Sequence, residues 1–100
     1  MADRERNNTD MDSSKGTCEV TVSNDNGLHM GPSSKIAQLA QSFRCDLTLS
    51  RSGGEPVDAK SMIDLLTLAA EKGTVLIVEA RGEDAEEALS SLSKLFESGL

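Results

Sequence analysis

The sequence predicts an α+β fold in which all helices pack on one face of an antiparallel sheet. Alternating apolar and polar residues at 18–22 and at 45–50 are typical of half-buried strands. The continuous, partly β-branched stretch 74–80 is typical of a central strand. Apolar residues at helical spacing follow residues 29 and 84 and predict two longer helices. Short turns and few helices favour a single antiparallel layer that is covered on one side.

The first strand, Cys18-Glu19-Val20-Thr21-Val22, follows a polar and charged stretch without periodicity. This change predicts a disordered tail over residues 1–16 and one folded domain over residues 17–100. The turn residues 24–27 end the strand, and Gly27 suits a positive φ.

The first of the two longer helices is expected to begin at His29 or Met30. Pro32 is tolerated there because first-turn amides lack intrahelical acceptors. The second follows Asp84, which has the helix-capping spacing with Glu87. The apolar stripes of these helices are Ile36, Leu39, Ala40 and Phe43 in the first, and Ala85, Ala88, Leu89, Leu92, Leu95 and Phe96 in the second.

Two shorter elements lie between these helices. Residues 55–59 predict a weak return strand, which Pro56 confines to a sheet edge or a bulge. Ser61 and Asp64 have capping-box spacing and predict the start of a short helix. That helix is apolar over much of its circumference, with Met62, Ile63, Leu65, Leu66 and Leu68.

Composition argues against several functional classes. The net charge is −7 and the chain has no Trp or Tyr, so neither a duplex-binding surface nor an aromatic stacking platform for nucleic acid is expected. No apolar run approaches the roughly 20 residues of a membrane helix, so no membrane insertion is expected. Because the opening residues also lack the apolar region of a secretory signal, we expect a cytoplasmic protein.

The two cysteines, Cys18 and Cys45, both lie within alternating apolar patterns. Buried reduced thiols are the favoured interpretation, and a disulfide stays open if their two strands are neighbours. Two cysteines and one histidine without close spacing do not make a zinc site. We therefore expect neither a metal nor a cofactor.

The single histidine, His29, lies between a turn and a helix start. The free first-turn amides there, at Met30 and Gly31, and the helix dipole make a favourable place for an anion. The same dipole favours the neutral, nucleophilic imidazole. This position suits phosphoryl transfer, and a plain capping or surface histidine is the alternative.

Several segments resemble one known family. Gly27-Leu28-His29-Met30-Gly31-Pro32 resembles the Gly-Leu-His-x-Arg-Pro segment of HPr, the histidine-containing phosphocarrier of the sugar phosphotransferase system. The resemblance continues in order from about Cys18 to Phe96, through Glu19-Val20-Thr21-Val22, Ala59-Lys60-Ser61, Gly73-Thr74-Val75 and Gly82-Glu83-Asp84.

The resemblance implies an open-faced β-sandwich, in which a four-stranded antiparallel sheet carries three helices on one face. It implies that His29 accepts a phosphoryl group on Nδ1 from phosphorylated enzyme I. That group then passes to a downstream acceptor protein in sugar uptake or its regulation. It also implies a monomeric carrier rather than a stand-alone enzyme.

Further positions follow from the same resemblance. Ser61 matches a second phosphorylation position, which an HPr kinase modifies in some lineages. Met62, Ile63 and Leu66 match the apolar patch that docks partner proteins, together with the start of the first helix. The alternatives are that Ser61 only caps its helix and that Met62 and Leu66 belong to the core.

One residue departs from the family pattern. Gly31 stands where the family has an arginine, whose guanidinium would contact the phosphoryl oxygens. Lys35, Arg51 and Lys60 are the residues that we consider as other sources of charge. The departure also supports a second hypothesis, a regulatory binding module with weak or no transfer at His29 and control through Ser61.

Overall fold

The computed structural model describes residues 15–100. Of the predicted tail over 1–16, residues 1–14 lie outside this described part, and the last two residues form the start of the first strand. The elements in chain order are β1 (Lys15–Thr21), α1 (Met30–Gln41), β2 (Asp46–Arg51), β3 (Val57–Asp58), α2 (Met62–Thr67), β4 (Val75–Arg81) and α3 (Ala85–Glu97).

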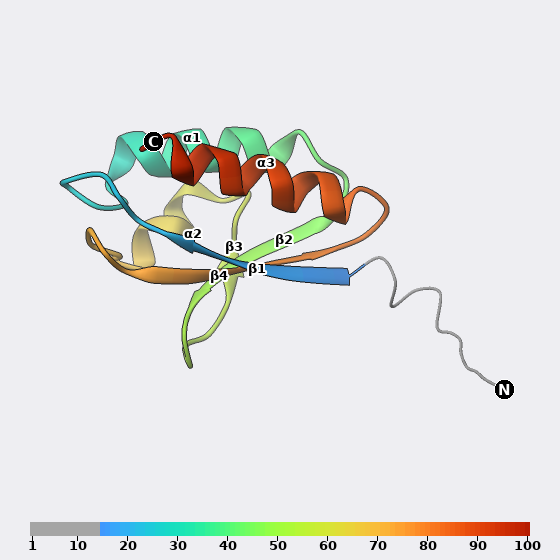
Figure 1. Cartoon of the computed structure of the whole chain (residues 1–100), viewed down its shortest axis with the longest axis horizontal. Coiled ribbons are helices and arrows are strands. Elements are labelled where there is room, and N and C mark those ends of the chain that lie inside the picture. Colours follow the sequence, from blue (N-terminus) through green and yellow to red (C-terminus); the bar gives the residue numbers. More distant parts are fainter. Residues whose placement is uncertain (1–14) are drawn as a thin grey trace, which may run out of the picture.

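The four strands form one antiparallel sheet in the order β1-β4-β2-β3. The three helices all cover the same face of this sheet, and the other face is left open (Figure 1). The predicted α+β open-faced sandwich is therefore confirmed, with β4 as one of its two central strands.

The core lies between the sheet and the helices. Every second residue of the central strands points into it, and Leu47, Leu49, Leu76 and Val78 are at most 1% exposed. The helices contribute Ile36, Leu65, Leu92 and Phe96 to the same cluster. Each fully buried apolar side chain contributes about 1.5–3 kcal/mol, so this largely aliphatic core holds the layers together without Trp or Tyr.

The two edge strands differ from their predicted bounds. β1 begins at Lys15 rather than Cys18, because its ladder with β4 continues to the pair Lys15 and Arg81. β3 contains only Val57 and Asp58. Its shortness is consistent with Pro56, which has no N–H to donate to a ladder.

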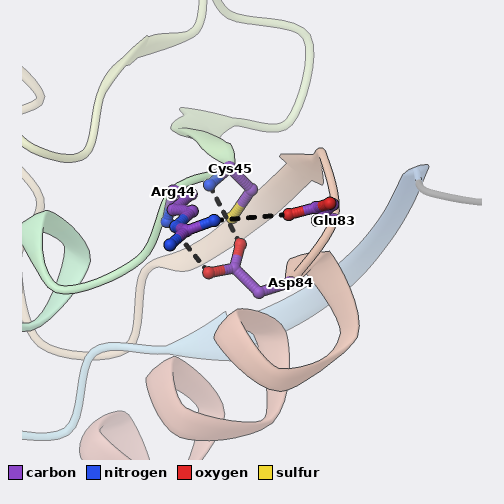
Figure 2. A network of polar contacts seen from close by, with 4 residues as sticks. All are labelled: Arg44, Cys45, Glu83 and Asp84. Carbon is purple, nitrogen blue, oxygen red and sulfur yellow. Dashed lines mark hydrogen bonds and ion pairs between the residues drawn. The ribbon is translucent and has the colours of Figure 1, made fainter.

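The predicted capping role of Asp84 is wrong. The side chain makes no capping hydrogen bond to α3, and its backbone is not in the extended conformation of a cap. Instead, the carboxylate accepts hydrogen bonds from the backbone N–H groups of Arg44 and Cys45, both at 2.9 Å (Figure 2). Asp84 thereby ties the start of α3 to the loop between α1 and β2, and Arg44 adds an exposed ion pair with Glu83 at 3.7 Å.

The two cysteines are free thiols, as favoured from the sequence. Cys18 lies in β1 and Cys45 directly precedes β2, and β4 separates these two strands. Two strand spacings amount to about 10 Å, which is too far for a disulfide. Burial raises the pKa of Cys18, and burial together with Asp84 raises the pKa of Cys45 to about 11, so both thiols are protonated and unreactive near neutral pH.

The Asp84 contact predicts a specific pH dependence of stability. The N–H of Arg44 holds the pKa of Asp84 below its ordinary value of 3.8, so the folded state favours the carboxylate. The resulting contribution to the free energy of unfolding is fully present above the ordinary pKa. It is lost as the pH falls through the lower pKa that Asp84 has in the folded state. We expect Asp84→Ala to lower the free energy of unfolding at neutral pH more than Glu83→Ala does. Urea unfolding from about pH 7 to about pH 3 tests this; a difference between the variants that does not shrink on acidification would contradict it.

Candidate functional site

His29 is the residue immediately before α1, where it occupies the N-cap position in extended conformation. The helix therefore begins at Met30, as predicted. The His29 side chain makes no capping hydrogen bond, and the backbone carbonyl accepts the N–H of Ser33 at 3.0 Å. The imidazole is exposed to solvent and is not used by the helix itself.

The loop before His29 is fixed against the end of α2. The N–H of Leu28 donates to the carbonyl of Ala70 at 2.9 Å, and the Leu28 side chain is buried. Gly27 has a φ of +69°, and a Cβ at this position would collide with the Ala70 carbonyl. The Asn24 side-chain amide donates to the Gly27 carbonyl and closes the turn. Only glycine fits at position 27. Its close approach to the Ala70 carbonyl fixes the position of the loop that carries His29.

The first turn of α1 leaves backbone donors available beside His29. Within residues 15–100, the N–H groups of Met30 and Gly31 have no acceptor, and Pro32 has no N–H. The first turn carries no acidic residue. These amides and the positive end of the helix dipole therefore favour an anion next to the imidazole, by about 0.3–1 kcal/mol for the dipole alone.

The imidazole lies directly beside Gly31. A Cβ on Gly31 would be 3.4 Å from Cε1 and 3.9 Å from Nδ1 of His29. The Nδ1 edge of the ring is thus close to position 31 of α1, where glycine has no side chain. Apart from the adjoining helix backbone and the two chain neighbours, no other heavy atom of residues 15–100 lies within 4 Å of that Cβ position, so a group attached to Nδ1 has space on this side.

The end of α2 is held by a cation from β2. The Arg51 guanidinium donates from Nε to the Leu68 carbonyl at 3.0 Å and from a terminal nitrogen to the Ala69 carbonyl at 2.8 Å. Ala69 itself has a φ of +49°, in the left-handed region. These bonds satisfy carbonyls at a helix end next to Ala70, the residue that anchors the His29 loop.

His29 lies at the surface of the protein. Both His29 and Met30 are exposed, and Met30 is 64% exposed. A cavity of about 310 Å³ lies elsewhere, between β1 and the end of α3, and is lined by Val20, Ser23 and Phe96 among others. An exposed imidazole is accessible to a reactant that is carried by another protein.

Residues 17–98 match the family model described as "PTS HPr component phosphorylation site". The chain belongs to the HPr family. Phosphocarrier protein HPr of Xylella fastidiosa (strain Temecula1) is 44% identical over 79 residues, which make up 79% of this chain and 88% of that protein. Phosphocarrier protein NPr of Escherichia coli (strain K12) is 40% identical over 85 residues, or 85% and 92% of the two chains.

Solved structures agree with this assignment. The crystal structure of HPr from Bacillus anthracis str. Ames superposes with a TM-score of 0.76 at 33% identity, covering 82% of this chain and 96% of that one. Membership of the HPr family supports a phosphocarrier role of this chain in the phosphotransferase system. It also implies interaction with enzymes of that system.

Ser61, the second predicted position in this HPr-family chain, caps α2. Its hydroxyl accepts the N–H of Asp64 at 3.2 Å, so the predicted cap is confirmed. The preceding Lys60 is bound to the other end of α1: its ammonium donates to the Phe43 carbonyl, and its own carbonyl accepts the Gln41 side-chain amide, both at 2.9 Å. Ser61 and His29 therefore lie at opposite ends of the α1/α2 pair.

The predicted docking residues on α2 are unequally exposed. Ile63 is 68% exposed, Met62 and Leu66 are half-buried, and the intervening Leu65 is fully buried. The core alternative thus applies in part to Met62, which packs against the core cluster. Ile63 and Met30 are large apolar side chains that the fold leaves in solvent.

Sequence reasoning missed the roles of Arg51 and Lys60 in holding helix ends. Both act on backbone carbonyls of residues 17 or more positions away. No local sequence pattern predicts such a contact. In the sequence, a Lys or Arg that binds a distant carbonyl cannot be distinguished from one that is simply exposed near a turn.

The positive φ of Ala69 predicts a stabilising substitution. A left-handed conformation costs an L-residue about 1–2 kcal/mol, and glycine loses about 0.5–1 kcal/mol through greater freedom in the unfolded chain. The first effect is larger, so we expect Ala69→Gly to raise the free energy of unfolding by about 0.5–1 kcal/mol. Urea denaturation measures the change, and Ala88→Gly, in the interior of helix α3, serves as a control that is expected to destabilise. A loss of stability in Ala69→Gly would contradict the interpretation.

Proposed function

We propose that His29 accepts a phosphoryl group on Nδ1 from phosphorylated enzyme I and passes it to a downstream acceptor protein. The proposal is supported by the place of His29 directly before α1, where Nδ1 is 3.9 Å from the Cβ position of Gly31 and where, among residues 15–100, the N–H groups of Met30 and Gly31 have no acceptor. The chain acts as a carrier of the phosphotransferase system in sugar uptake or its regulation, and it docks its partners one at a time as a monomer.

The transfer needs little covalent machinery. The Nδ1 lone pair of neutral His29 attacks phosphorus, an N–P bond forms, and the bond between phosphorus and the donor's histidine nitrogen breaks. Its electron pair returns to that nitrogen, while the proton of His29 stays on Nε2. The protein's contribution is to hold the ring and to meet the developing charge with fixed backbone donors, which is positioning rather than acid–base chemistry.

The exposed apolar side chains support partner docking around this ring. Met30 stands beside His29 at the start of α1, and Ile63 and Leu66 lie on the neighbouring α2. Methionine adapts its shape to different surfaces, which suits a carrier that meets a donor and then an acceptor.

Loading of the protein tests the proposal directly. After incubation with enzyme I and phosphoenolpyruvate, intact mass measurement is expected to show one phosphoryl adduct that is acid-labile and base-stable. We expect His29→Ala to lose the adduct and Ser61→Ala to keep it. If the wild-type chain stays unmodified while another HPr is loaded by the same enzyme I, the carrier proposal fails.

A second candidate function is a regulatory binding module controlled through Ser61. It is favoured by Gly31, which leaves the imidazole without an adjacent arginine, and by the position of Ser61 one residue before α2 and close to exposed Ile63. A phosphate on Ser61 would change the charge beside a docking surface.

This candidate predicts a different adduct. With an HPr kinase and ATP, we expect an acid-stable phosphoryl group that is lost in Ser61→Ala and retained in His29→Ala. Intact mass measurement before and after acid treatment separates the two kinds of adduct. Absence of any acid-stable adduct, with a control HPr modified under the same conditions, would remove Ser61 regulation by this kinase.

A further inference from the structure

A phosphoryl group on His29 brings charged oxygens to a helix start where Gly31 offers no side chain. Because residue 31 carries no cation, a positively charged side chain that meets these oxygens would come from another part of the fold. Three residues are candidates from the sequence: Lys35, Arg51 and Lys60. The three residues differ in the hydrogen bonds that their side chains make in the structure.

Arg51 and Lys60 are occupied elsewhere. The Arg51 guanidinium binds the carbonyls of Leu68 and Ala69 at the end of α2, and the Lys60 ammonium binds the Phe43 carbonyl beyond the end of α1. Moving either side chain to His29 would leave these helix-end carbonyls without their charged donors, at a cost similar to the gain. Neither cation is available to the phosphoryl group.

Lys35 differs from both. It is exposed on α1, and within residues 15–100 no hydrogen bond or ion pair engages its ammonium. It lies four residues after Gly31, so the two positions share one face of the helix. That face is the solvent side, because the opposite side of α1 carries the buried residues Pro32, Ser33, Ile36, Ala37 and Ala40.

Helix geometry directs the Lys35 side chain toward His29. Each Cα–Cβ bond in an α-helix tilts toward the N-terminus, and Cβ positions four residues apart are separated by only about 5–6 Å. Position 31 bears no side chain that would block this path. The place where its Cβ would stand is 3.9 Å from Nδ1 of His29, so the flexible four-carbon stem of Lys35 spans the gap to a group on Nδ1.

We propose that Lys35 supplies the charge-assisted contact to the phosphoryl oxygens on His29, through the space that Gly31 leaves open. This inference rests on the proposed function of His29. The ammonium keeps its proton and donates hydrogen bonds to the oxygens; it forms and breaks no covalent bond. Glycine at position 31 is then part of the site, because it clears the path of the cation.

The first experiment detects the contact without any partner protein. The chain is phosphorylated chemically with phosphoramidate, and the phosphoryl ionisation is followed by ³¹P NMR. An ammonium next to the oxygens favours the dianion, so we expect this ionisation in Lys35→Gln to move to a pH higher by about one unit than in wild type. Lys15→Gln removes an equal charge from the open face of the sheet, where Lys15 pairs with Glu79 at 3.3 Å, and is expected to leave the titration unchanged.

The second experiment measures transfer from enzyme I. We expect Lys35→Gln to lower the maximal rate about tenfold at saturating carrier, as loss of one charge-assisted contact predicts, and Lys35→Arg to retain most of it. Adding Gly31→Arg to Lys35→Gln is expected to restore the rate, because a cation then stands at position 31. Lys15→Gln again serves as the control of equal charge.

The outcomes distinguish the proposals. If Lys35→Gln raises only KM and leaves the ³¹P titration unchanged, Lys35 is a docking cation and the contact is refuted. If Lys35→Gln and Lys15→Gln behave alike in both experiments, the contact is refuted as well. If enzyme I does not load the wild-type chain, the proposed function fails, while the chemically phosphorylated protein still reports whether Lys35 meets the phosphoryl group.

Discussion

The close backbone approach between Gly27 and Ala70 is the contact on which the functional site depends. It joins the loop after β1 to the end of α2, two segments that are distant in sequence, and the hydrogen bond from Leu28 to Ala70 fixes their relative position. The backbone thereby fixes the position of His29, and within residues 15–100 its imidazole makes no hydrogen bond. In the proposed transfer, His29 would therefore bind a phosphoryl group without breaking a hydrogen bond found among residues 15–100.

Charged side chains reinforce this arrangement by binding backbone groups across the fold. Asp84 binds two amides of the loop before β2, Arg51 binds the carbonyls at the end of α2, and Lys60 binds a carbonyl beyond the end of α1. Such bonds satisfy helix and loop ends that would otherwise need water, whereas the exposed ion pair of Arg44 and Glu83 adds little stability. Arg51 and Lys60 are engaged in these structural contacts and are therefore not available near His29.

The sequence was sufficient for the order of elements and for the position of His29, because both follow from local patterns. Alternation and helical spacing depend only on which face of an element is buried. The start of β1 was missed since Lys15 and Gly16 carry no alternation and are ordered by their partners in β4. Asp84 was misassigned as a cap because capping and tertiary binding require the same carboxylate, and only the fold places the amides of Arg44 and Cys45 nearby.

Glycine at position 31 has two opposing effects. It weakens the first turn of α1 by about 0.5–1 kcal/mol relative to alanine, and it removes the bidentate fork that an arginine would present. In return, the first-turn amides and the space beside Nδ1 stay open to Lys35. A lysine ammonium acts as a point charge on a flexible stem, so it neutralises the phosphoryl oxygens without fixing their orientation. In the proposed transfer, orientation would then depend on the partner docked at Met30 and Ile63. We therefore expect the transfer rate to depend more on docking geometry than in a relative with arginine at this position.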